Sequence, residues 1–288
     1  MGGAAFHPLF GLRNWPAVFE WGSVVVALGF WGVFIALSRR AGRMHPGLAL
    51  VIALTGVGVL EPAANWSCYC AYDPRLHHFP TSWPYFRLAP VVQPLVTVIA
   101  YPYYLMFPAL VAFGLWRGMS HRLPAGHPVN RHPLVALLAG GYAVGVVFDL
   151  VAQFALFPSG VLVWTQIAGP AIRSGQTTQY PLLTTVIWPV FTAVTTLFLW
   201  RDDTGRTIAA PSVDRIGARR RPLAEVGVAW AALCLTYGIW IGAFGVIRWS
   251  GQAKTLARPW PFAGHRIFDP DGYYKAAGET GAVEGSGR

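Results

Sequence analysis

Six long apolar stretches constrain the fold of this chain more than any other feature of its sequence. A membrane-spanning helix needs roughly 20 mostly apolar residues. The chain is only 12% charged, against about 25% in soluble domains. The stretches are too long for membrane β-strands and show no alternation. We therefore predict an all-α fold, a polytopic membrane helix bundle that forms one integral membrane domain over residues 1–288. The six predicted helices cover about residues 16–38, 46–67, 91–117, 132–157, 180–200 and 223–249.

The arginines between these stretches predict how the chain lies in the membrane, because short cytoplasmic loops are enriched in Lys and Arg. The second loop holds only Arg75 and Arg87 and the fourth only Arg173, whereas the first, third and fifth loops are more basic. We expect a multi-pass protein of the cell membrane with both termini outside, although basic residues in the tail oppose this assignment. Topology and anionic lipid headgroups account for the net charge of +10, so nucleic acid is not a predicted partner.

Two regions on the predicted outer side are rich in proline and aromatic residues. Residues 68–90 predict a structured cap at the interface, where amphipathic rings are favoured. The tail, residues 250–288, repeats this composition, and we expect disorder after about residue 278. Cys68, Cys70, His77 and His78 are metal-ligand types in one loop, but zinc sites usually have two to four residues between their cysteines. We predict that no metal binds here.

Ionisable side chains inside membrane helices are costly and mark functional sites by default. Glu61 and Asp149 lie in predicted helices, about 22 Å and 25 Å from the basic ends at 1.5 Å per residue. Asn65 and Gln153 follow them at i+4, on the same helix faces. We expect one cavity at this depth, opening outward. Other polar and aromatic residues expected at this depth are Gln93, Tyr101, Tyr104, Thr184, Thr185, Tyr237 and Trp240.

Structural interpretations of these residues stay open at this point. Glu20, at the outer start of the first helix, can simply be solvated. Asn65 and Gln153 can be interhelical hydrogen-bond partners. Glu61 precedes Pro62 and can mark a helix end, and Asp149 can serve only to bind a tyrosine or tryptophan.

Eight motifs are distributed from the second predicted helix to the tail. They are Glu61-Pro62-Ala63-Ala64-Asn65-Trp66, Tyr72-Asp73-Pro74, Ser82-Trp83-Pro84, Arg131-His132-Pro133-Leu134, Arg201-Asp202-Asp203-Thr204-Gly205-Arg206, Ile247-Arg248-Trp249-Ser250-Gly251, Pro259-Trp260-Pro261 and Phe268-Asp269-Pro270-Asp271-Gly272-Tyr273-Tyr274. Together these motifs resemble the avermectin spirocyclase-like (AveC-like) family of actinobacterial membrane proteins. The resemblance implies a polyketide-tailoring enzyme of antibiotic biosynthesis that closes a dihydroxy-ketone into a spiroketal and can also act as a dehydratase. The resemblance does not identify which residues of this chain are catalytic.

Depth and chemistry then suggest the site. Spiroketal closure needs acid–base groups and a stabiliser for an oxocarbenium ion, and it requires no redox cofactor. We predict Glu61 and Asp149 as the catalytic pair, acting on a hydrophobic small molecule. The predicted substrate-binding residues are Asn65, Trp66, Tyr101, Gln153, Tyr237 and Trp240.

Other functions fit the same cavity. The chain can be a transporter or a hydrophobic-ligand-binding membrane protein, or a cyclase or hydratase that acts on a terpenoid or steroid. Two features argue against a transporter: the chain has only six predicted membrane helices, and its sequence shows no inverted repeat. The sequence does not give the oligomeric state.

Overall fold

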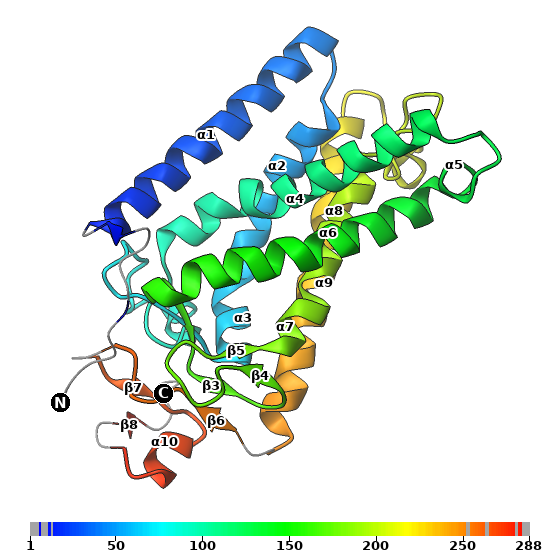
Figure 1. The fold of residues 1–288 in the computed structure, drawn as a ribbon. Coiled ribbons are helices and arrows are strands. Elements are labelled where there is room, and N and C mark those ends of the chain that lie inside the picture. The colour runs from blue at the N-terminus through cyan, green and yellow to red at the C-terminus, as the bar shows by residue number, and fades with distance from the viewer. Residues whose placement is uncertain are drawn as a thin grey trace.

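The structure is a computed structural model that describes residues 6, 11–12, 14–251, 254–262, 265–279 and 282–283. Within these residues it is mostly helical, with short strands gathered at one end (Figure 1). The disorder predicted after residue 278 falls mainly on residues 280–281 and 284–288, which lie outside the described residues.

Six helices of the described chain are long and apolar enough to cross a membrane, as the sequence predicts. Each begins and ends close to a predicted stretch. In chain order they are α1 (Trp15–Ala41), α2 with η2 and α3 (Pro46–Val57, Gly58–Leu60 and Glu61–Cys68), α4 (Leu95–Arg122), α6 (Pro133–Leu156), α7 with α8 (Leu182–Ile187 and Pro189–Leu199) and α9 (Arg221–Trp249).

Prolines explain where the helices depart from the predicted ranges. The third helix does not begin at residue 91, because Pro94 is extended and α4 starts after it. The fifth does not begin at residue 180, since Tyr180–Pro181 forms strand β5. Proline lacks an N–H and clashes with the preceding turn. Pro62 and Pro189 accordingly stand where the second and fifth spans divide into two helices, whereas α4 continues through Pro102 and Pro108.

The outer faces of several helices are apolar and exposed. On α1, Trp21 and Val25 are each 68% exposed and Leu28 is 65% exposed. Large contiguous apolar surfaces are rare on soluble monomers. These helices therefore have the surface expected of a multi-pass membrane protein.

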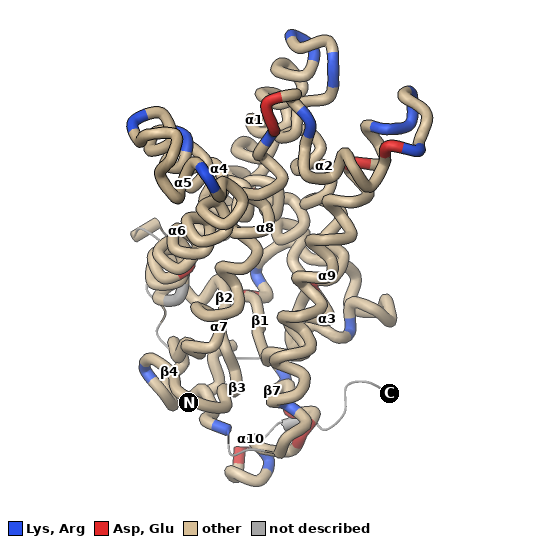
Figure 2. Tube along the Cα trace, turned by 90° about the vertical axis from the view of Figure 1, so that its right-hand side faces the viewer, with Lys and Arg blue, Asp and Glu red and all other residues tan. Residues whose placement is uncertain are grey.

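The two ends of the bundle differ in charge. Figure 2 shows Lys and Arg gathered on the loops at one end, after α1, around the short helix α5 (Pro128–Arg131) and between α8 and α9. The last of these loops contains the 3-10 helix η5 (Ala210–Val213). The opposite end carries the strands and the first and last described segments of the chain (Figure 1).

Strands of two or three residues build a cap at that opposite end. The second loop is structured, as predicted, but the fourth loop and the tail also belong to the cap. Strand β1 (Cys70–Tyr72) pairs with β2 (Leu162–Trp164), and β3 (Gln166–Ile167) pairs with β6 (Thr255–Leu256). The other pairs are β4 (Ala171–Ile172) with β5, and β7 (Ile267–Phe268) with β8 (Ala282–Val283).

The tail is held to the cap by buried polar groups. Tyr274, in the short helix α10 (Tyr273–Ala276), is fully buried, and its hydroxyl donates to the carbonyls of Thr165 and Ala257 at 2.7 and 3.0 Å. The Lys254 ammonium donates to the Tyr69 hydroxyl at 2.8 Å and lies 3.8 Å from Asp271. Burial, and then the charge of Arg248, lowers the pKa of Lys254 to about 8.

Candidate functional site

A cavity of about 220 Å³ lies where the cap meets the bundle. Helices α1, α3, α4, α6, α7 and α9 line it, together with Trp188 between α7 and α8 and the paired strands β1 and β2. Most of its wall is aromatic or aliphatic, with a few polar side chains among them. Small-molecule sites are concave and mostly apolar with a few placed polar groups, so this cavity is the candidate site.

Glu61 enters the cavity from the junction of α2 and α3. A 3-10 turn precedes it and Pro62 follows it, so the carboxyl occupies the first turn of α3. The positive end of a helix dipole favours a carboxylate at this position. The junction also packs closely on α4. A Cβ added at Gly58 would lie only 3.1 Å from the Cα of Val98, so the glycine allows this approach. Local sequence thus fixes where the 5% exposed Glu61 sits.

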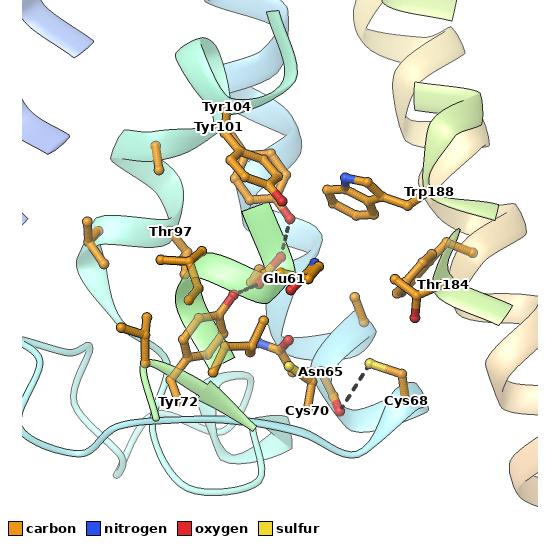
Figure 3. A pocket seen from close by; sticks show the side chains of 18 of the residues that line it. Glu61, Asn65, Cys68, Cys70, Tyr72, Thr97, Tyr101, Tyr104, Thr184 and Trp188 are labelled. Atoms are coloured by element: carbon orange, nitrogen blue, oxygen red, sulfur yellow. Dashed lines mark hydrogen bonds between the residues drawn. The ribbon is translucent and has the colours of Figure 1, made fainter. Parts of the chain in front are cut away.

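Three tyrosines from three different elements donate to the Glu61 carboxyl. Tyr72 of β1 donates at 2.7 Å, and Tyr101 of α4 and Tyr237 of α9 donate to the other oxygen. The hydroxyls of Tyr101 and Tyr237 also contact each other. Figure 3 shows Tyr72 and Tyr101 directed at Glu61 from two sides. Burial, and then the Glu61 charge, raises the pKa of Tyr72 well above its usual value, so this phenol stays protonated and donates.

Asp149 occupies a tight contact between helices. Gly141, Gly145, Asp149 and Gln153 recur at i+4 on one buried face of α6. A Cβ at Gly141 or Gly145 would lie under 3.0 Å from the Cα of Ala193 or Pro189, so the two glycines let α8 approach closely. The Asp149 carboxylate, 0% exposed, accepts from the Tyr180 hydroxyl of β5 and from Gln153 Nε2 at 3.1 Å. It is absent from the cavity wall, which Gln153 reaches instead.

Three buried polar atoms of the wall residues have no hydrogen-bond partner among the described residues, and one of them is the indole Nε1 of Trp164. The other two are Gln153 Oε1 and Thr184 Oγ1. The bond to Asp149 orients the Gln153 amide, because its NH₂ group must face the carboxylate. The carbonyl is left as an acceptor for a ligand hydroxyl, and an unsatisfied buried group costs about 1–3 kcal/mol. Figure 3 shows Thr184 and Trp188 across the cavity from Glu61.

Aromatic rings form the rest of the wall. The ring centroids of Trp188 and Trp240 are 5.2 Å apart at an edge-on angle, and those of Trp164 and Trp240 are 6.3 Å apart. The ring centroids of Tyr104 and Trp188 are 6.2 Å apart. The Tyr104 hydroxyl lies close enough to the Glu61 and Asp149 carboxyls to interact electrostatically with both. Aromatic faces attract cations, so the wall suits a reaction with a cationic intermediate.

The structure brings most of the predicted site residues together. Glu61, Asn65, Tyr101, Gln153, Tyr237 and Trp240 all line the cavity. Gln153 bonds to Asp149, as the i+4 spacing suggests, but Asn65 donates to Gln93 Oε1 at 3.0 Å and has no bond to Glu61.

Trp66 is the predicted substrate-binding residue that lies away from the cavity. Its ring packs on Trp249, and the Arg248 guanidinium sits 4.0 Å from the ring centroid. The site residues that the sequence analysis missed are Tyr72, Trp164 and Trp188. Tyr72 stands in one of the family motifs, which was the available signal, but its depth was not evident because it lies in a loop.

The residues weighed for metal binding are separated. Cys68 and Cys70 line the cavity, whereas His77 pairs with Glu20 through its Nδ1 at 2.8 Å and His78 contacts the Phe79 carbonyl. The described residues contain no group of three His, Cys, Asp or Glu side chains placed to hold a metal. That no metal binds here stays a prediction. Glu20 has a specific partner and is not merely solvated.

The described residues thus form a helical protein of the multi-pass type, with an aromatic cavity built around a buried carboxyl group. A family model described as "Spirocyclase AveC-like" matches residues 38–268. Because the match covers most of the chain, the protein belongs to this family, as the motifs suggest. No curated protein and no solved structure matches the chain.

Proposed function

We propose that the protein is a membrane-embedded enzyme that closes a dihydroxy-ketone of polyketide or related lipid-like character into a spiroketal. The observation that carries this proposal is the Glu61 carboxyl with its three tyrosine donors in a cavity of aromatic rings. The family supplies the reaction class. The cavity supplies acid–base groups and a wall for a cation.

The reaction proceeds by loss of one water. One substrate hydroxyl adds to the ketone carbon and forms a hemiketal. Protonation of the hemiketal hydroxyl releases water and leaves an oxocarbenium ion. The second hydroxyl then attacks the cationic carbon, loses its proton and closes the other ring. A folded polyol held in this cavity gains rate and stereochemistry from orientation.

Glu61 can perform both proton transfers. As the protonated acid it gives its proton to the departing hydroxyl. The resulting carboxylate is stabilised by the hydroxyls of Tyr72, Tyr101 and Tyr237 and sits beside the cation. It then takes the proton of the second hydroxyl, which restores the acid. The faces of Trp188 and Trp240 add cation–π stabilisation.

In this proposal Asp149 does not contact the substrate and acts through Gln153. Its carboxylate fixes the Gln153 amide, and Gln153 Oε1 with Thr184 Oγ1 binds the substrate hydroxyls. Asp149 is therefore a positioning residue, whereas the sequence analysis paired it with Glu61 in acid–base catalysis.

The proposal also includes the orientation inferred from the arginine distribution. The basic end faces the cytoplasm, so both termini and the cavity lie near the outer face. Reporter fusions after Arg122 and Arg215 test it, and an external signal at either site contradicts it.

The enzymatic proposal is tested with purified protein and a synthetic dihydroxy-ketone. We expect product lighter by one water, with a ratio of spiroketal configurations different from that of the spontaneous reaction. Glu61→Gln keeps the shape and removes the titratable proton, so turnover should fall by about 10²- to 10⁴-fold. Glu20→Gln is the matched control, since Glu20 binds His77 outside the cavity wall.

The result that contradicts the proposal is equally clear. Wild-type protein that gives the rate and isomer ratio of the protein-free reaction is not a spirocyclase for that substrate class. Tight binding of the dihydroxy-ketone without conversion would favour a hydrophobic-ligand-binding protein or transporter.

A further inference from the structure

A second cavity lies at the basic end of the bundle, away from the cap. It has a volume of about 330 Å³ and lies between the start of α2, the end of α8, the α8–α9 loop and the start of α9. None of its lining residues belongs to the candidate active site. Four arginines line it, Arg43, Arg201, Arg206 and Arg221, against two carboxylates, Asp214 and Glu225. The wall therefore carries an excess of positive charge.

The two carboxylates do not neutralise all four guanidinium groups. Arg206 forms an ion pair with Asp214 at 2.5 Å, and Glu225 accepts from the Thr207 hydroxyl at 2.8 Å. Arg43 and Arg201 form no ion pair among the described residues. Burial, and then the nearby charge of Arg43, lowers the pKa of Arg201. The Glu225 charge offsets part of this effect at Arg201, but the wall still holds four guanidinium groups against two carboxylates, and this excess favours binding of an anion.

The loop that carries Arg201 is held in a defined conformation. The Asp202 carboxylate accepts from the backbone N–H groups of Thr204 and Arg206 at 2.9 and 2.8 Å. The turn places Gly205 at φ +78°, a conformation that L side chains rarely adopt, and Arg201 Nη1 donates to the Gly205 carbonyl at 2.7 Å. This family motif therefore presents the Arg201 guanidinium beside the cavity rather than in free solution.

Further donors face the same space. The Nε–H of Arg221 is buried without an acceptor among the described residues. His45 Nδ1 accepts from the Gly47 N–H at 3.1 Å, so the neutral ring carries its proton on Nε2. The helices α2 and α9 both start at this cavity, with Pro46 and Arg221 in its wall. Helix N-termini favour anions.

We propose that this cavity binds a phosphate group, carried either by an anionic phospholipid headgroup or by a soluble phosphate compound. Arg43 and Arg201 are its principal ligands, because planar guanidinium groups match phosphate oxygens in pairs of hydrogen bonds. Leu50, Phe198 and Ala229 give the same cavity apolar wall atoms. Basic pockets between membrane helices are the kind of site that holds phospholipid headgroups.

The test measures binding of phosphatidylglycerol, phosphatidylcholine and inorganic phosphate to the purified full chain by native mass spectrometry and thermal shift. We expect phosphatidylglycerol to bind more tightly than phosphatidylcholine, and phosphate to compete with it. Arg43→Gln with Arg201→Gln should weaken phosphatidylglycerol binding by about 10- to 100-fold, since charge-assisted hydrogen bonds are lost. Arg215→Gln with Arg219→Gln is the matched control. It removes two exposed charges outside the cavity wall, both from the α8–α9 loop that carries Arg201.

Each outcome decides the proposal. Stabilisation by phosphate but not by phosphatidylglycerol supports the site and assigns it to a soluble ligand. Equal affinity in wild type, the double variant and the control overturns it. If the double variant does not fold, Arg43→Gln alone is used, because Arg43 is exposed, and an unchanged phosphatidylglycerol affinity in that variant also overturns it.

Discussion

The two buried carboxyls of the bundle are held in different ways. Glu61 lies in the cavity wall and receives hydroxyls from three elements, two of them bundle helices and one a cap strand. Asp149 lies behind the wall, and its hydrogen bonds come from Gln153 on its own helix and from Tyr180 on a cap strand.

In the proposed reaction, this difference separates proton transfer at Glu61 from substrate positioning by Asp149. Three converging donors would stabilise the charge that appears when Glu61 gives up its proton, as a catalytic acid requires. The surroundings of Asp149 instead orient one amide toward the cavity. Both carboxyls depend on a tyrosine from the cap, so the cap completes both ends of the site.

The largest expected effect contrasts the two carboxyls directly. Glu61→Gln should lower kcat by about 10²- to 10⁴-fold, whereas Asp149→Asn should mainly raise KM, by about tenfold, because a misoriented Gln153 loses substrate hydrogen bonds. Steady-state kinetics on the dihydroxy-ketone give both values. Equal losses of kcat in both variants would show that the carboxyls act as a catalytic pair and that our assignment of Asp149 is wrong.

A smaller effect is expected when one tyrosine is removed from each carboxyl. Tyr237→Phe should lower kcat by about tenfold or more, because a hydrogen bond to a charged group contributes about 1.5–3 kcal/mol. Tyr180→Phe should leave kcat within a few-fold of wild type and lower the thermal unfolding midpoint instead. Turnover and unfolding measured on the same preparations check both variants. A greater loss of kcat in Tyr180→Phe would place the reacting atoms at the Asp149 end.

The smallest effect concerns the stability of the cap, which supplies a tyrosine to each of the two carboxyl groups. Burial depresses the pKa of Lys254 to about 8, below the usual value of about 10.4. Folding therefore destabilises the charged form of Lys254. This cost to the free energy of folding is complete below pH 8, where Lys254 is charged in both the folded and unfolded states, and it decreases as the pH rises toward 10. Wild type should gain stability relative to Lys254→Met between pH 8 and 10, measured as unfolding midpoints. Parallel curves for the two proteins across this range would show that Lys254 does not titrate there.

The sequence by itself determined the architecture and much of the cavity. Hydrophobic runs of spanning length leave only helices as a solution, because backbone polar groups in lipid must bond within the segment. The i+4 spacing of Gly141, Gly145, Asp149 and Gln153 puts them on one face of α6 regardless of context. Because charged groups are costly to bury in lipid, the positions of Glu61 and Asp149 in the apolar stretches are enough to predict a functional role for them.

Only the tertiary structure decided which side chains meet. Tyr72 lies in a loop, where no periodicity predicts depth, and pairing of β1 with β2 carries it to Glu61. Composition predicts a cap over residues 68–90, but strands of two or three residues are too short to show alternation. The strand pairs of the cap and the contribution of the fourth loop could therefore not be predicted from the sequence. Asn65 shares a helix face with Glu61 but donates a hydrogen bond to Gln93. Helix periodicity predicts which face a side chain lies on, but the fold decides which polar group from another part of the chain lies within hydrogen-bonding distance.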